Sequence, residues 1–212
     1  LTALGALVLA GTGVVATHRA ADAIRYAPRQ AAGTVMLFDW PSGGWLRLPA
    51  RRTEVGGDHE EPLALQWAGT ADRIEQVLQA GGWRRPPRWA SRAALLWLLP
   101  SAPAGQLPVL AKFHQGEPPA LSFERELDPS QRLVIRLWRT SYRVSTASDP
   151  AAPLWVGMAT RERLMHPAGL LTLAKTEPDF AAPTAQLAKL LQTHKVAVTI
   201  RQRDALAVLL LQ

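Results

Sequence analysis

Large apolar side chains alternate with Ala or Gln along residues 63–68, which read Leu-Ala-Leu-Gln-Trp-Ala. A period of two predicts a β-strand. The pattern changes directly afterwards, because apolar residues recur at three- and four-residue intervals between Ala71 and Leu78. Thr70 stands before this stripe as a helix N-cap, and Gly81-Gly82 follows it as a left-handed stop. A strand followed closely by an amphipathic helix is therefore expected.

The same patterns predict the other elements of the chain. Further strands are expected near 34–40, 120–125, 132–139, 153–160 and 196–200, and helices near 90–99 and 183–192. The segment 206–211 is apolar on both faces, so it is either a central strand or a short buried helix. A turn is expected at 41–44 and a loop at 49–62, which is rich in Pro, Gly and acidic residues. These elements predict an α+β or α/β fold: a single domain, residues 31–212, with a mixed β-sheet flanked by helices. The strands at 132–139 and 153–160 are expected to be neighbours at its centre.

An uncharged, apolar run at residues 1–17 precedes this domain and predicts an N-terminal hydrophobic helix. At about 1.5 Å per residue it falls just short of a bilayer core, so it fits the end of a transmembrane helix. A secretory signal remnant and a buried core helix are the alternatives. Residues 18–30 follow as a basic juxtamembrane linker, containing His18, Arg19, Arg25 and Arg29.

The chain carries a formal net charge of +7, and 20 of its 24 basic residues are arginine. Coding bias of the source genome is one explanation of this excess. An anionic partner is the other, either a phospholipid head group, a phosphorylated lipid or nucleic acid. The sequence contains no cysteine, which excludes disulfides and thiolate metal sites.

Three blocks stand out between residues 107 and 157: Leu-Pro-Val-Leu-Ala-Lys-Phe-His-Gln-Gly at 107–116, Arg-Leu-Val-Ile-Arg-Leu-Trp-Arg at 132–139 and Pro-Leu-Trp-Val-Gly at 153–157. Together they resemble the LssY C-terminal domain. That resemblance implies the end of a bacterial multi-pass inner-membrane protein that also carries a DedA-type or type-2 phosphatidic acid phosphatase segment. The expected partners are these upstream membrane domains of the same polypeptide and an anionic lipid surface. The resemblance favours a periplasmic location for the domain, whereas the basic flank favours the cytoplasmic side.

Four residues of these blocks are candidates for ligand binding: Lys112, His114, Arg136 and Trp138. Arg136 and Trp138 share one face of their strand, and an arginine beside an indole can hold a phosphate or carboxylate. If the leucine-rich face of this strand is core, the two side chains project toward a cleft or solvent. Lys112 and His114 lie on a loop and could bind an anion or move a proton. A packed surface pair and a structural loop histidine are the alternatives.

A basic and aromatic cluster, formed by Trp83, Arg84, Arg85, Arg88 and Trp89, is a candidate for contact with a membrane or another anion. A solvated connection between two helices is the alternative. Stacking on nucleic-acid bases is a third possibility, but no nucleic-acid-binding motif accompanies the cluster, so no specific nucleic-acid partner is expected. The histidines lack the spacing of a metal pair, and no metal site or cofactor is expected.

The catalytic signature of lipid phosphatases is incomplete in this chain. Pro41-Ser42-Gly43 is followed by Gly44, and Leu98 stands where a nucleophilic histidine would follow Ser91-Arg92. The sequence therefore favours an accessory ligand-binding or interaction domain without catalytic machinery of its own. The alternative is an autonomous hydrolase acting on a phosphorylated or acyl substrate through residues such as His114 and Arg136.

Overall fold

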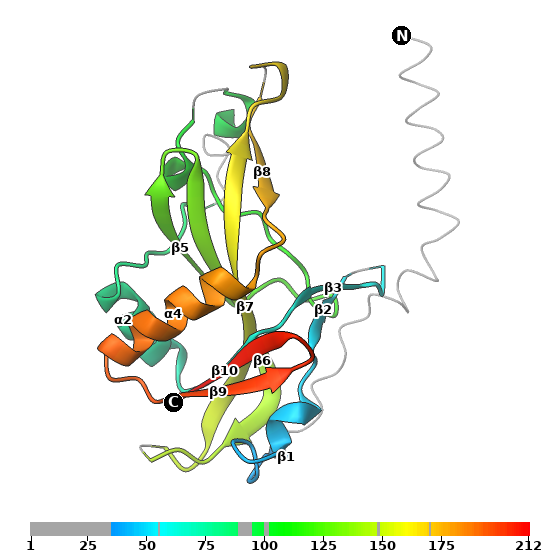
Figure 1. Cartoon of the computed structure of the whole chain (residues 1–212), viewed down its shortest axis with the longest axis vertical. Coiled ribbons are helices and arrows are strands. Elements are labelled where there is room, and N and C mark those ends of the chain that lie inside the picture. The colour runs from blue at the N-terminus through cyan, green and yellow to red at the C-terminus, as the bar shows by residue number, and fades with distance from the viewer. Residues whose placement is uncertain (1–34, 55, 89–94, 100–101, 148, 170) are drawn as a thin grey trace. The chain divides into compact units, whose positions relative to one another are not determined.

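Two long antiparallel strands, β6 (Gln131–Val144) and β7 (Ala152–Met165), form the centre of the domain (Figure 1). The computed structural model describes residues 35–54, 56–88, 95–99, 102–147, 149–169 and 171–212, which belong to one compact unit. The two strands pair from Gln131 opposite Arg163 to Val144 opposite Ala152, with an irregularity between Arg139 and Arg143. This pairing confirms the predicted adjacency of 132–139 and 153–160.

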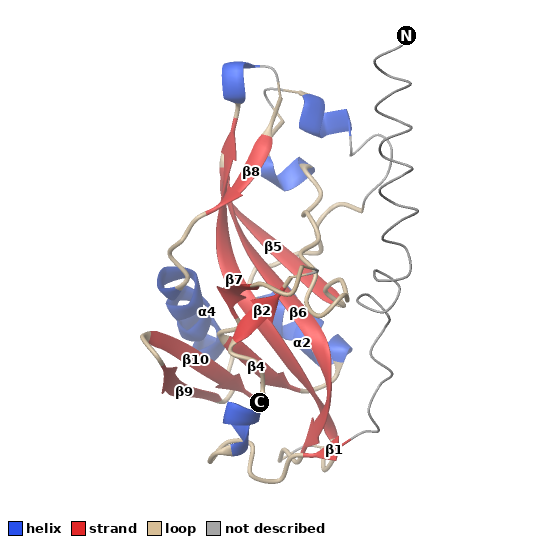
Figure 2. Ribbon diagram, turned by 90° about the vertical axis from the view of Figure 1, so that its right-hand side faces the viewer, coloured by secondary structure: helices blue, strands red, loops and turns tan. Residues whose placement is uncertain are grey.

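Six further strands complete a mixed, eight-stranded sheet within the described residues. At one end of the central pair, β5 (Leu121–Asp128) is antiparallel to β6, and β8 (Leu173–Thr176) is antiparallel to β7 (Figure 2). At the other end, β4 (Leu65–Ala68), β10 (Leu206–Leu211) and β9 (Val198–Arg203) extend the sheet beyond β7, and β1 (Val35–Met36) pairs in parallel with β6. Because β10 is hydrogen-bonded to strands on both sides, the apolar segment 206–211 is a central strand.

Two helices cover one face of the sheet. Helix α2 (Ala71–Ala80) begins after Thr70, whose hydroxyl accepts a hydrogen bond from the Arg73 amide as predicted for an N-cap. Helix α4 (Ala181–Thr193) crosses the sheet (Figure 1) and carries Pro183 in its first turn, where a missing amide costs nothing. The apolar stripes of both helices pack on the leucine-rich face of β6 and form the larger core.

The opposite face is covered by irregular segments. At one end, residues 37–48, which include the 3₁₀ turn η1 (Gly44–Arg47), bury Trp40 and Trp45 against Trp138 and Val156. At the other end lies a stretch that we call the covering segment, residues 102–117, with the 3₁₀ turn η3 (Ala104–Gln106). Its residues Ala104 and Leu107 pack against Leu164 of β7.

Two local predictions were wrong. The expected loop at 49–62 contains a two-stranded hairpin, β2 (Arg51–Thr53) with β3 (His59–Pro62), separate from the main sheet. The expected strand at 34–40 is limited to β1, because the chain turns where the carbonyl of Asp39 accepts hydrogen bonds from the amides of Ser42, Gly43 and Gly44.

Other predictions fall partly or wholly outside the described residues. The N-terminal hydrophobic helix and the basic linker lie outside them, and so does most of the helix expected at 90–99, of which the described part forms the 3₁₀ turn η2 (Leu96–Leu98). Within the described part of the chain, no helix has the length and apolar character needed to cross a membrane.

Candidate functional site

Arg136 and Trp138 lie on the predicted face of β6, but that face is closed. Arg136 is fully buried and Trp138 is 3% exposed. The covering segment lies on both, since Arg136 Nη2 donates to the Leu110 carbonyl (3.0 Å) and Trp138 Nε1 donates to the Glu117 carbonyl (3.1 Å). The expected projection toward a cleft or solvent is therefore corrected: backbone carbonyls of the covering segment occupy the position of a ligand.

Arg136 belongs to a buried ionic network that also contains Arg132, Glu124 and Glu162. Glu162 of β7 bridges the two arginines, at 2.9 Å from Arg132 Nε and 2.6 Å from Arg136 Nη2. Glu124 of β5 pairs with Arg132 at 3.0 Å. Arg132 also donates to the carbonyls of Ala104, Leu107 and Pro108 in the covering segment. The network thus joins three strands of the sheet to the irregular segment above them.

The two carboxylates of this network have opposite pKa shifts. Burial raises the pKa of Glu124 to about 7, because it outweighs the attraction of Arg132 and Arg84. Burial also acts to raise the pKa of Glu162, but the attraction of Arg136 and Arg132 outweighs it and holds that pKa below its ordinary value. Glu162 is therefore the carboxylate that stays ionised beside the two buried arginines at neutral pH.

Lys112 and His114 are held by the β2–β3 hairpin. Lys112 forms an ion pair with Glu61, and Arg52 bonds the same carboxylate at 2.6 Å. Burial alone would raise the pKa of Glu61, yet the hydrogen bonds from Lys112 and Arg52 lower it to about 2. His114 Nδ1 accepts a hydrogen bond from the Thr53 amide (3.0 Å), and the imidazole lies edge-on to Trp138 with the ring centroids 5.7 Å apart.

The structure therefore brings three of the four candidates to one face of the sheet, with His114 against Trp138 and Arg136 under Leu110. Lys112 points instead to the acid of the hairpin. Sequence reasoning missed Glu61, Glu124 and Glu162, because they lie 51, 8 and 30 residues from their basic partners. The alternation of charges along neighbouring strands is the one signal that could have found the last two.

The residues of the basic and aromatic cluster also lie in different environments. Trp83 is buried in the larger core. Arg84 donates a hydrogen bond to the Gly105 carbonyl (2.7 Å) and forms an ion pair with Glu124 (3.2 Å). Arg85 pairs with Glu75 at 2.7 Å and lies over the Phe123 ring. Arg88 is exposed, and Trp89 lies outside the described residues.

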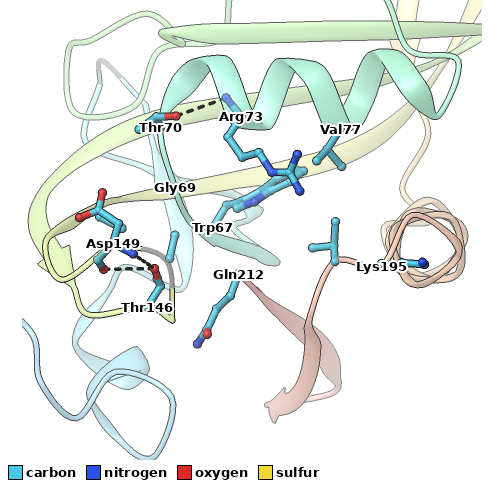
Figure 3. Close-up of a pocket in the computed structure, with 12 residues that line it drawn as sticks. Trp67, Gly69, Thr70, Arg73, Val77, Thr146, Asp149, Lys195 and Gln212 are labelled. Carbon is cyan, nitrogen blue, oxygen red and sulfur yellow. Dashed lines mark hydrogen bonds between the residues drawn. The ribbon is translucent and has the colours of Figure 1, made fainter.

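An open pocket of about 380 Å³ lies away from the buried ionic network, where α2 follows β4 (Figure 3). The loop between β6 and β7 supplies Thr146 and Asp149, and the connection from α4 to β9 supplies Lys195. Figure 3 shows the Arg73 side chain extending from α2 toward Trp67. Thr146 and the backbone of Asp149 exchange hydrogen bonds at 3.0 and 3.1 Å, which fixes the loop at the rim.

This pocket has the lining of a binding site for an amphiphilic anion. The lining contains two basic residues, Arg73 and Lys195, and one acid, Asp149, so the formal charge of its side chains is positive. Figure 3 shows the Lys195 ammonium turned away from Trp67 and Gln212, so Arg73 is the cation beside the apolar wall. Trp67 and Val77 supply apolar walls. Sites for small molecules combine apolar walls with a few polar groups in this way. Sequence reasoning missed the pocket because its residues come from four separate segments.

A family model described as LssY C-terminus matches residues 45–207. The chain belongs to this family. No curated protein and no solved structure matches the chain.

The LssY C-terminus match includes the buried network and all pocket residues except Gln212. Both features therefore lie within the family domain. Among the described residues of this domain, no group of three or more His, Asp or Glu side chains could hold a metal ion.

Proposed function

We propose that the chain is an accessory ligand-binding or interaction domain of a bacterial inner-membrane protein that handles phospholipids or phosphorylated lipid carriers. In this proposal the rest of the polypeptide carries a DedA-type or type-2 phosphatidic acid phosphatase segment and any catalytic activity. Membership of the LssY C-terminus family supports this setting. The net charge of +7 is compatible with an anionic lipid partner.

A binding role is supported by the contrast between the buried network and the open pocket. Arg136 and Arg132 are fully buried and bonded to carboxylates and backbone carbonyls, so neither is available to a substrate in this conformation. Arg73 and Lys195 line open space instead. A phosphate beside Arg73 and an acyl or isoprenoid stem along Trp67 would match the two halves of the lining.

A binding experiment tests this proposal. Isothermal titration of the full chain with water-soluble dihexanoyl phosphatidic acid should give measurable binding, and dihexanoyl phosphatidylcholine should bind more weakly. Arg73→Gln should weaken binding of the phosphatidic acid about five- to thirtyfold, because a charge-assisted hydrogen bond contributes about 1–2 kcal/mol in a partly open site. Arg47→Gln is the control, since Arg47 is exposed and pairs only with Asp39 among the described residues.

Two results would contradict the proposal. Equal binding of the two lipids, or no effect of Arg73→Gln, would show that the pocket does not bind the anionic lipid. Release of inorganic phosphate from phosphatidic acid by the purified chain, abolished by His114→Ala, would support the autonomous hydrolase instead.

A further inference from the structure

Five apolar side chains are exposed at the end of the sheet formed by β7 and β8, on both sides of the two strands. We call them the apolar apex: Leu95 (58% exposed), Leu98 (61%), Leu99 (49%), Met165 (38%) and Leu173 (47%). Met165 and Leu173 are paired across β7 and β8. Hydrogen bonds from Thr172 to the carbonyls of Trp97 (2.8 Å) and Leu99 (2.6 Å) hold the η2 segment against the same end.

The segments of the apex are anchored on their inner side. Leu96 and Trp97 pack against Leu164, while Leu98 and Leu99 of the same apolar run remain outside. The exposed leucines are therefore not displaced core residues of a loose loop. Single exposed aliphatics are common, but several from different segments at the same end of a sheet indicate a contact surface.

Arg163 and Lys175 lie behind Met165 and Leu173 on the same face of the strands, whereas the η2 segment packs on the opposite face, which carries Leu164 and Ala174. Arg163 and Lys175 are opposite each other across β7 and β8, each two residues from the apex residue of its strand. Side chains two residues apart in a strand share a face and lie about 7 Å apart. Glu177 pairs with Arg163 at 2.8 Å, and no ion pair of Lys175 is found among the described residues.

We propose that the apolar apex inserts into an anionic lipid surface, with Lys175 and Arg163 at the level of the head groups. The roughly 7 Å step from apolar to basic side chains matches the depth of about 5–10 Å at which interfacial elements lie. The long stems of Lys and Arg allow the charge to stay in the head-group layer while the strand enters more deeply. This surface contact goes beyond the proposed function, because it involves the membrane itself and residues that do not line the pocket.

The absence of cysteine from the sequence allows a site-specific test in the full chain. Single variants Leu98→Cys and Leu173→Cys would be labelled with a polarity-sensitive fluorophore. Ile200→Cys is the matched control, because Ile200 is 50% exposed on the edge strand β9 and lies outside the apex. Each labelled protein would be mixed with vesicles of phosphatidylcholine, with or without phosphatidylglycerol.

Insertion predicts a blue shift and quenching by spin-labelled lipid at the two apex positions with phosphatidylglycerol vesicles, and little change at Ile200. Lys175→Gln should weaken this association about fivefold, since one basic group near an anionic surface contributes about that factor. Thermal unfolding of each variant would establish that the fold is retained. If the label at one apex position perturbs the fold, the other apex position still provides the test.

The proposal is overturned if the Ile200 position responds like the apex or if neither apex position is quenched by lipid. A blue shift that depends on protein concentration without vesicles would assign the apex to a second copy of the chain. Binding of soluble phosphatidic acid to the pocket should be unchanged by Leu98→Ser. Loss of membrane insertion by the apex and loss of lipid binding by the pocket are thus measured separately.

Discussion

Replacing Glu162 with Gln should destabilise the domain more than any change at an exposed ion pair. Glu162 is the carboxylate shared by Arg132 and Arg136, and both guanidinium groups are fully buried. Gln preserves the shape of the side chain but removes its charge. Its amide NH₂ would also face a guanidinium donor, so at least one of the two hydrogen bonds is lost.

The magnitude follows from the charges that remain. After Glu162→Gln, Glu124 is the one acid left in the network, and it contacts Arg132 but no hydrogen bond joins it to Arg136. Removing one partner of a buried ion pair costs about 3–5 kcal/mol, because the other charge stays desolvated. Domains of this size unfold with about 5–15 kcal/mol, so the variant should lose a large part of its stability.

Glu177→Gln is a matched control on the same sheet. Glu177 also serves two arginines, at 2.8 Å from Arg163 and 3.8 Å from Arg161, but the Arg163 side chain is 57% exposed. Solvent screening limits such a pair to about 1 kcal/mol or less. Urea unfolding followed by tryptophan fluorescence would give both free energies.

The stability lost in Glu162→Gln should also depend on pH. The lowered pKa of Glu162 means that its contribution is present above its ordinary pKa of 4.5 and is lost as the pH falls below that value. The difference between wild type and Glu162→Gln should therefore shrink in acid. A cost below about 1 kcal/mol at pH 7, or one equal to that of Glu177→Gln, would refute a buried, charge-bearing network.

Two further predictions concern stability. Burial raises the pKa of Glu124 from 4.5 to about 7, so the stability that it contributes is fully present below pH 4.5 and is lost as the pH rises through 7. Glu124→Gln should remove a decline of about 3 kcal/mol across that window in urea unfolding at several pH values, and an unchanged profile would contradict the shift. Gly157→Ala would place a Cβ 2.4 Å from the Arg136 carbonyl oxygen, so it should lower the unfolding free energy by about 1–3 kcal/mol. Gly43→Ala, with no atom within 4 Å of the added Cβ, is its control, and equal thermal shifts would argue against crowding at Gly157.

The elements that the sequence predicted well are those with local signals. Thr70 caps α2 through an amide three residues away, and Pro183 occupies the first turn of α4. The strands 132–139 and 153–160 are read from their own periodicity. The β2–β3 hairpin had no such signal, because Pro and glycine around an acidic run are equally typical of a loop.

The burial of the charged residues could not be predicted from local sequence. A strand with two Arg residues on one face predicts a face turned toward solvent or a ligand, because arginine is seldom buried without partners. The partners here come from β5 and β7, so the pairing of the strands had to be known before the burial of Arg132 and Arg136 could be inferred.

The covering segment explains what these arginines do for the fold. Much of it is irregular, so several of its carbonyls lack the partners that a regular strand would supply, yet buried carbonyls need donors. A guanidinium offers five N–H groups in a fixed plane. Arg132 and Arg136 use them to bond Ala104, Leu107, Pro108 and Leu110. The arginines thus hold an irregular segment on the sheet, while Glu162 supplies the carboxylate with which both of them pair. This division of roles directs the search for function away from the Arg-Leu-Trp strand and toward the open pocket and the apolar apex.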